Sequence, residues 1–228
     1  MSEVQSDAVL AAYYRLRTRI TAQSDELFGR YAGEVQCRRG CYYCCDDIAV
    51  LPIEFEALRR ELAREGIPDG AGSGGPPGDD GLSPAELAGL RSRDRTRDGV
   101  LPNPEAGRRR CGFLGAGGEC TVYPHRPVIC RTHGLPLAYR LYEYDETGTP
   151  VSGTKHIDSW CDLNFTEIPS ETAAAYFDRH GRINQARVNE ELEVLNRRFL
   201  ETDAGWRYRG RDWIRLTELV VDFGRNYA

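Results

Sequence analysis

Apolar residues near the start of the chain recur at the spacing of a helix. The positions that would share one face of that helix are Val9, Leu10, Tyr13, Leu16, Ile20, Leu27 and Phe28. This spacing predicts a long amphipathic helix from roughly Ser6 to Tyr31, with Ser24-Asp25 as a candidate break and restart. Gly33 follows the last apolar position and is expected to end the helix.

A short apolar segment and a second helix are expected next. The stretch from Asp46 to Leu51 predicts a strand or an extended segment. Pro52 suits the first turn of a helix, and Glu54 and Glu56 suit the positive end of the helix dipole. A stripe at i, i+3 and i+7 supports this helix from Pro52 to about Arg64 and consists of Phe55, Leu58 and Leu62.

The composition changes in the middle of the chain. Residues 66–82 are largely Gly, Pro, Asp and Ser, which bury too little apolar surface to offset the entropy lost on ordering. We therefore expect a flexible loop there. Ser83-Pro84-Ala85-Glu86 is a capping box with proline at the first helical position, and it predicts a helix that ends near Gly99. The alternating charges from Arg91 to Asp98 indicate a solvated face of this helix.

Two β-hairpins and a short helix are expected in the second half of the chain. Phe113-Leu114 and Thr121 to Tyr123 flank a glycine-rich turn and predict the first hairpin. Arg126-Pro127 is expected to begin a short helix that carries Cys130. The segment from Leu137 to Tyr144 precedes a turn and another extended run, which predicts a second hairpin.

The C-terminal part, at about residues 170–228, is expected to be helical. One helix is predicted from Ile183 to Leu200 and another from Trp213 to Phe223. The apolar stripe of the first consists of Val188, Leu192, Leu195 and Phe199. Together the patterns predict a helix-dominated α+β fold in which residues 1–228 form a single domain. The N- and C-terminal helices are expected to pack around a small, irregular antiparallel β region.

The composition is that of a folded protein outside membranes. The hydrophobic fraction of 40% among 228 residues is enough to build a core. No apolar run approaches the roughly 20 residues that cross a bilayer, and the N-terminus lacks the basic and apolar regions of a secretory signal. We therefore expect a cytoplasmic protein without a membrane partner. The net charge of −5 argues against a dedicated nucleic-acid binder.

The cysteines fall into two groups. Four lie in the stretch Cys37-Arg-Arg-Gly-Cys41-Tyr-Tyr-Cys44-Cys45, and the other four are Cys111, Cys120, Cys130 and Cys161. In a reducing cytosol such a set favours metal ligation over disulfides. Thiolates select zinc, copper(I) and iron–sulfur clusters, and a distant ligand group can complete the shell that a close group begins. All eight cysteines are therefore predicted metal ligands, in one site or two, and the metal is expected to organise the cysteine loops.

The adjacent pair Cys44-Cys45 constrains how these ligands are shared. Neighbouring side chains in an extended segment point to opposite faces, so both thiols reach one ion only through a strained geometry. Cys44 completes the spacing with Cys37 and Cys41 and is assigned to a primary site. Cys45 is expected to serve a second site or a different cluster atom, or to act as a reactive thiol.

Three basic residues near the second cysteine group are further candidates. His133 lies three residues after Cys130 and is a candidate metal ligand or proton donor, with a plain loop histidine as the alternative. Arg131 and Arg126 flank Cys130 and could donate hydrogen bonds to cluster sulfurs and offset thiolate charge. A surface salt bridge is the alternative for both arginines. His133 and Arg131 are the two candidate catalytic residues.

The remaining polar residues of this region are expected to have structural roles. Asp162 and Asn164, which follow Cys161, are typical turn residues. His125 and His156 are expected to lie on the surface.

The two cysteine groups together resemble a known family. Cys-x3-Cys-x2-Cys-Cys before Pro52, followed by Cys-x-Phe-Leu, Cys-Thr-Val-Tyr, Arg-Pro and Cys-Arg, is similar to the YkgJ-type cysteine-cluster family. The resemblance covers Cys37 to Cys161, over half the chain, and joint agreement of both groups is specific. The family's own pattern is Cys-x2-Cys-x2-Cys-Cys, so this chain has one extra residue between Cys37 and Cys41.

The resemblance implies a zinc- or iron-chelating domain, and its members are often labelled iron–sulfur oxidoreductases. We therefore expect an iron–sulfur cluster or iron centre with a redox or modifying role on an unidentified small-molecule or protein substrate. The alternatives are a structural zinc module that binds a partner and a protein for metal chelation or delivery. Cys37-x3-Cys41-x2-Cys44 also matches the radical S-adenosylmethionine spacing, but that fold needs repeated βα units that this chain lacks.

Overall fold

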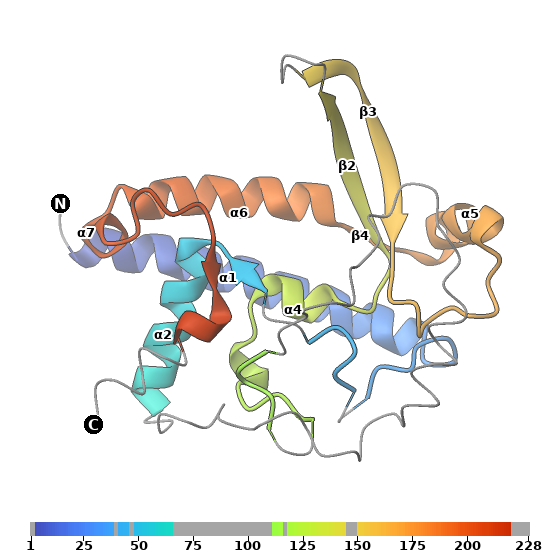
Figure 1. Ribbon diagram of the computed structural model, residues 1–228, viewed down its shortest axis with the longest axis horizontal. Coiled ribbons are helices and arrows are strands. Elements are labelled where there is room, and N and C mark those ends of the chain that lie inside the picture. Colours follow the sequence, from blue (N-terminus) through green and yellow to red (C-terminus); the bar gives the residue numbers. More distant parts are fainter. Residues whose placement is uncertain are drawn as a thin grey trace. The chain divides into compact units, whose positions relative to one another are not determined.

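The computed structural model describes residues 3–38, 41–45, 48–65, 111–115, 118–144 and 150–219 (Figure 1). Within these ranges the fold is α+β and helix-dominated, as the sequence predicts. The expected loop at 66–82 and the expected helix from Ser83 to about Gly99 lie outside the described residues. No described helix combines the length and the apolar character that crossing a bilayer requires.

The chain divides into two compact units, and each is built from two separate segments. Unit 1 consists of Met1–Val35 and Val128–Arg207, and unit 2 consists of Gln36–Pro127 and Tyr208–Ala228. Six of the eight cysteines therefore belong to unit 2, while Cys130 and Cys161 belong to unit 1.

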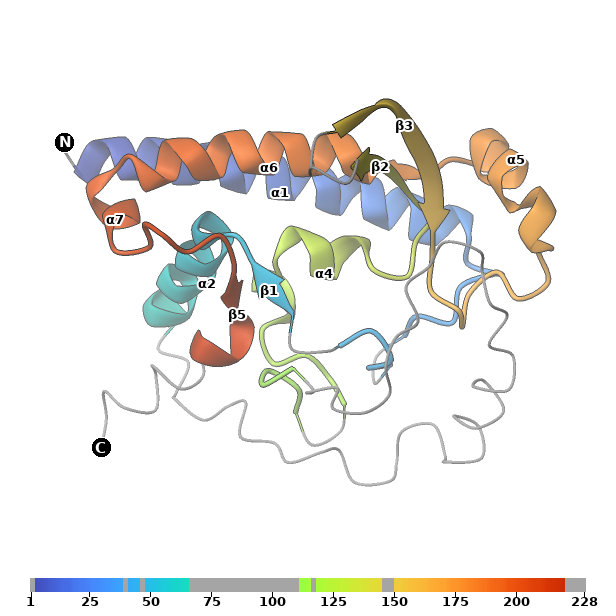
Figure 2. The same cartoon turned by 45° about the horizontal axis from the view of Figure 1, so that its top comes forward.

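Helices form the core of unit 1. Helix α1 (Glu3–Arg30) runs without interruption through the expected break at Ser24-Asp25, where Ser24 is buried. It lies side by side with α6 (Gln185–Leu200), as Figures 1 and 2 show. The short helices α4 (Val128–Thr132) and α7 (Asp203–Trp206) also contact α1. The apolar stripe predicted for α1 is largely buried and includes Leu10, Tyr13, Leu16, Ile20 and Leu27.

Unit 1 also contains a three-stranded sheet with the order β3-β2-β4. Strands β2 (Leu137–Tyr144) and β3 (Pro150–Ser159) form the predicted second hairpin, with Leu137 opposite Ser159. Strand β4 (Ile183–Asn184) pairs with β2 in parallel, so the sheet is mixed and not purely antiparallel. Ile183 and Asn184 were expected to be helical. Instead Ile183 is fully buried in the sheet, and the Asn184 side chain caps α6 by accepting a hydrogen bond from the Arg187 N–H.

An aromatic cluster holds the remaining helix of unit 1, α5 (Ser170–His180). Phe177 of α5 is completely buried and meets Tyr31, Trp160 and Phe165 edge to face. The Tyr31 hydroxyl donates a hydrogen bond to the carbonyl of Gly181, the residue that ends α5. Burial raises the pKa of Tyr31 to about 12. This cluster ties the end of α1 to α5.

Unit 2 is organised around helix α2 (Pro52–Glu65), which matches the predicted helix closely. Strands β1 (Ala49–Val50) and β5 (Ile214–Arg215) form an antiparallel pair in which Val50 faces Ile214. The helix expected from Trp213 was therefore placed too early: Ile214 is fully buried and paired in the strand, and residues 216–219 are helical. The residues after 219 lie outside the description.

The predicted first hairpin of unit 2 is reduced to a single β-bridge between Leu114 and Cys120. Beyond the bridge the chain turns into a 3-10 helix, η1 (Tyr123–His125), with proline in its first turn. Pro124 explains the difference, because proline lacks the N–H that would continue a strand ladder.

Candidate functional site

The first cysteine group forms an irregular loop of unit 2 between α1 and β1. Two turns shape it: the Cys41 N–H donates to the Arg38 carbonyl and the Cys45 N–H donates to the Tyr42 carbonyl, each at 3.0 Å. The thiols of this loop are close in sequence, and none of them lies on a helix or a strand.

The first residue of the second cysteine group contacts the last residue of the first group. The Cys111 N–H donates to the Cys45 carbonyl at 3.0 Å, although the two residues lie far apart in sequence. Cys120 forms the β-bridge with Leu114, and the Leu114 N–H donates to the Cys111 carbonyl at 3.2 Å. Backbone hydrogen bonds therefore connect Cys45, Cys111 and Cys120 in one part of unit 2.

The other two cysteines lie in unit 1, in two segments that a hydrogen bond connects. Cys130 lies on α4, and Cys161 begins a turn in which the Asn164 N–H donates to its carbonyl at 2.9 Å. The buried Asn164 side chain then donates to the carbonyl of Gly134, just after α4, at 2.7 Å. Asn164 is thus the expected turn residue, and it also ties the Cys161 turn to the end of the Cys130 helix. Asp162 is exposed in the same turn.

The thiols themselves can be compared with the needs of a soft metal. All eight cysteines are half-buried, and none of them forms a disulfide. Thiols in this state have the donor chemistry that zinc and iron–sulfur clusters require. However, no three Cys, His, Asp or Glu side chains in the described ranges are grouped closely enough to hold a metal ion. The donors therefore fit a soft metal in kind, while their arrangement is not that of a closed metal shell.

The two candidate catalytic residues lie on or just after α4. The Arg131 side chain is largely buried, and its Nη1 donates to Thr21 Oγ1 of α1 at 3.0 Å. Thr21 in turn donates to the Arg17 carbonyl at 2.8 Å, so Arg131 anchors α4 to α1. His133 is half-buried, and its N–H donates to the Ile129 carbonyl at 3.1 Å. Their roles beside a metal remain predictions.

One of the two histidines that were expected on the surface, His125, is enclosed. Only 13% of the His125 side chain is exposed, because Glu61 and Glu65 of α2 lie on its two sides. Nδ1 is 3.4 Å from the Glu61 carboxylate and Nε2 is 2.9 Å from that of Glu65. The sequence does show that Glu61 and Glu65 are one helical turn apart and share a face of α2. Nothing in the sequence indicated that His125 lies beside them. His156 is exposed, as expected.

Arg126 was expected beside cluster sulfurs or in a surface salt bridge. Its guanidinium carbon lies 3.7 Å from the ring centre of Tyr123, which is a cation–π contact beside η1. Its role beside cluster sulfurs stays a prediction.

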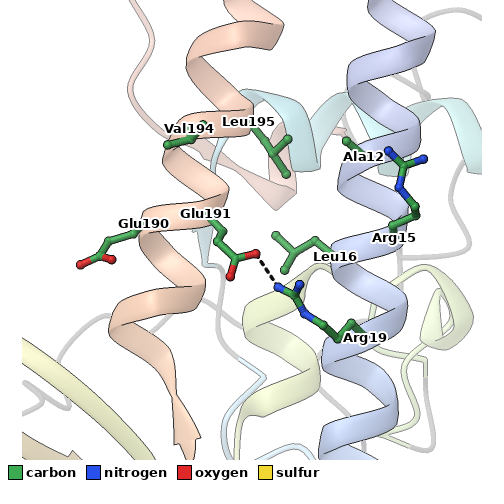
Figure 3. Close-up of a pocket in the computed structure, with 8 residues that line it drawn as sticks. All are labelled: Ala12, Arg15, Leu16, Arg19, Glu190, Glu191, Val194 and Leu195. Carbon is green, nitrogen blue, oxygen red and sulfur yellow. Dashed lines mark hydrogen bonds and ion pairs between the residues drawn. The ribbon is translucent and has the colours of Figure 1, made fainter.

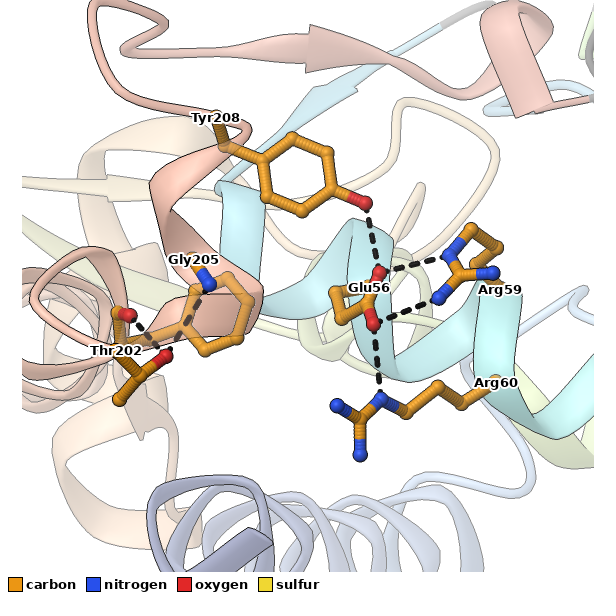
Figure 4. Close-up of polar contacts among 7 residues, drawn as sticks. Glu56, Arg59, Arg60, Thr202, Gly205 and Tyr208 are labelled. Carbon is orange, nitrogen blue, oxygen red and sulfur yellow. Dashed lines mark hydrogen bonds and ion pairs between the residues drawn. The ribbon is translucent and has the colours of Figure 1, made fainter. Parts of the chain in front are cut away.

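A buried ionic cluster on α2 was also missed. Glu56 is completely buried and accepts hydrogen bonds from Arg59, Arg60 and the Tyr208 hydroxyl (Figure 4). These four bonds measure between 2.7 and 2.8 Å. Burial alone would raise the pKa of Glu56, but the hydrogen bonds outweigh it and lower the pKa to about 2. The sequence predicted only a favourable position in the helix dipole; the arginines three and four residues later were the unused signal.

No protein-family model, curated protein or solved structure matches this chain. The resemblance to the YkgJ-type family therefore rests only on the cysteine spacing and the residues that flank the cysteines.

Proposed function

We propose that the cysteine groups bind a soft metal, as an iron–sulfur cluster or an iron centre, and that the metal serves redox or modifying chemistry. The observation that carries this proposal is the hydrogen bond from the Cys111 N–H to the Cys45 carbonyl. It places the start of the second cysteine group against the end of the first.

The state of the thiols supports the same proposal. Eight half-buried cysteines without a disulfide are compatible with thiolate ligands in a reducing compartment. The cysteines from Cys37 to Cys45 lie in a segment with local turns and without a helix or strand, and a metal would gather their thiols by rearranging this segment. This is the usual behaviour of small thiolate sites, in which metal binding and local folding are coupled.

The test is anaerobic purification followed by visible absorbance and analysis of iron, zinc and acid-labile sulfide. We expect iron with labile sulfide and absorbance near that of known iron–sulfur proteins. Zinc in whole-number stoichiometry without colour would favour a structural module instead. Protein that is folded and monodisperse but free of both metals would contradict the proposal.

A matched pair of variants shows whether the loop is responsible. Cys41→Ala removes a thiol from the loop, whereas Arg38→Ala changes an exposed side chain of the same loop and leaves all thiols in place. We expect the first variant to lose metal and the second to retain it. Equal metal content in both would place the metal elsewhere.

A further inference from the structure

The two long helices of unit 1 leave a groove on its surface. Helices α1 and α6 run in opposite directions side by side (Figures 1 and 2). The groove between them encloses about 630 Å³, and four residues of each helix line it. That volume is within the range of protein ligand sites, but here it lies along a helix pair.

The two sides of the groove carry opposite charge. On the α1 side lie Arg15 and Arg19, which are both exposed, and on the α6 side lie Glu190 and Glu191. Arg19 and Glu191 form an ion pair that spans the groove (Figure 3). Glu190 pairs with Arg140 at 3.2 Å, yet 55% of its side chain is exposed. Among the described residues no carboxylate forms an ion pair with Arg15.

The groove also has apolar residues at its centre, and the side chains on its two sides differ in how far they project. Leu16 is buried at 4% exposure, whereas Val194 is 39% exposed on the α6 side. Figure 3 shows Val194 and Leu195 across the groove from Ala12, whose side chain is a single methyl group. A projecting side chain on one helix therefore lies opposite a short one on the other.

We propose that this groove is a surface for self-association, and that a second copy of the chain docks on it face to face about a two-fold axis along the groove. Such an axis exchanges the two sides, so the basic side of each copy covers the acidic side of the other. A two-fold axis across the groove would bring like charges together. Homodimers with one self-complementary patch are the commonest oligomers of soluble proteins.

The same symmetry matches the shapes and the ion pairs. Val194 of each copy lies over the Ala12 side of the other, so the projecting side chain meets the short one. The Arg19–Glu191 pairs of the two copies come together at the axis, and each guanidinium then lies between two carboxylates. Arg15 then lies opposite the acidic side of the second copy. The four helices would pack as in an antiparallel four-helix bundle.

A second copy is a better occupant than an unrelated helix. Any helix that fits the groove needs acidic residues along one edge and basic residues along the other, with small or branched apolar residues between. The α1–α6 pair already presents that pattern in the required order. The proposal does not depend on metal binding.

Analytical ultracentrifugation of the full chain over a wide concentration range tests it, with a reductant present so that no dimer forms through disulfides. We expect a concentration-dependent dimer. Val194→Asp should raise the dimer dissociation constant at least tenfold. Val4→Asp should leave it unchanged, because Val4 is 76% exposed on α1 and does not line the groove. Circular dichroism checks that both variants fold.

Charge reversal tests whether complementary charges of the two grooves hold the copies together. Arg15→Glu with Arg19→Glu makes the groove wholly acidic, and Glu190→Arg with Glu191→Arg makes it wholly basic. Each double variant should be monomeric alone, and an equimolar mixture should form a dimer again. A wild-type chain that stays monomeric at every concentration would overturn the proposal, as would a dimer that Val194→Asp does not weaken or a mixture that does not associate.

Discussion

Glu56 shows, at the scale of single residues, how a charge can lie in the interior of unit 2. Its carboxylate is fully buried but receives four hydrogen bonds from two arginines and a tyrosine. Removing one partner from such a cluster leaves an uncompensated buried charge, which is far more costly than losing a surface ion pair. The cluster also fixes Tyr208, and with it the second segment of unit 2, on α2.

Acid should therefore weaken the protein through Glu56. Its pKa falls from 4.5 to about 2 on folding, so the stabilisation is complete above pH 4.5 and is lost as the pH falls towards 2. The shift corresponds to about 3 kcal/mol. Glu56→Gln should lower the free energy of unfolding at pH 7 by a similar amount and flatten its dependence on acid. Urea titrations at several pH values measure this, and Glu193→Gln, on the exposed face of α6, should change neither quantity.

The adjacent thiols Cys44 and Cys45 are expected to differ toward metal. Cys44 lies in a turn and not in the extended segment that the sequence predicted, so this expectation rests on the different surroundings of the two residues. The backbone contact of Cys45 with Cys111 supports its assignment to the ligands of the second group, while Cys44 follows the spacing of Cys37 and Cys41. Cys44→Ser should lower occupancy of the primary metal site. Cys45→Ser should spare that site but remove a second metal equivalent or one alkylatable thiol. Metal analysis and thiol titration distinguish them, and identical losses would mean that one centre uses both sulfurs.

At the scale of elements, the end of α5 depends on one glycine. Gly181 has a φ of 103°, and its N–H donates to the Phe177 carbonyl at 2.8 Å. A Cβ atom at this position would lie 2.7 Å from Nη1 of Arg30. Glycine adopts such a φ without steric cost, while other residues do not.

Gly181→Ala should therefore destabilise the protein, by roughly 1–3 kcal/mol. Gly29→Ala is the matched control, because Gly29 lies inside α1 and a Cβ atom there would meet nothing within 4 Å. That change should stabilise the protein by about 0.5–1 kcal/mol, since alanine is the better helix former. Thermal unfolding of both variants shows whether each change raises or lowers stability. A loss of stability in Gly29→Ala would contradict this prediction.

The elements also show what the sequence could and could not predict. Periodicity located α1 and α2, because each is long enough to repeat its pattern several times. The β2–β3 hairpin was predicted from the turn between two extended runs. The two-residue strands β4 and β5 have no period to detect, and they exist only because Leu137 and Val50 supply partners from distant segments. The cysteine spacing indicated the candidate metal ligands. It could not place Glu61 and Glu65 around His125, since that arrangement depends on how η1 packs on α2.

At the scale of the whole molecule, cysteines are found in both units, six in unit 2 and two in unit 1. If all eight serve metal, removing the metal should affect each unit. Structural thiolate sites can contribute on the order of 10 kcal/mol to folding, comparable with the roughly 5–15 kcal/mol that stabilises a typical domain.

Cys41→Ala in unit 2 and Cys130→Ala in unit 1 should therefore both give protein that is depleted in metal or insoluble. Chelation of the metal from the wild-type chain should lower its melting temperature. Soluble yield, metal content and thermal melting are the measurements. A double variant that remains soluble, folded and equally stable without metal would contradict a structural role for these thiols.

The division of each unit into two segments bears on the order in which the protein can form during synthesis. A nascent chain that has emerged as far as Arg207 already holds every residue of unit 1. At that moment unit 2 still lacks Tyr208, the partner of Glu56, and Ile214, the partner of Val50. Unit 2 carries six of the eight cysteines. Its fold is therefore incomplete, with its thiols already synthesised, until residues 208–215 leave the ribosome. Unit 2, the unit with most of the candidate metal ligands, is therefore the last of the two units to complete its fold.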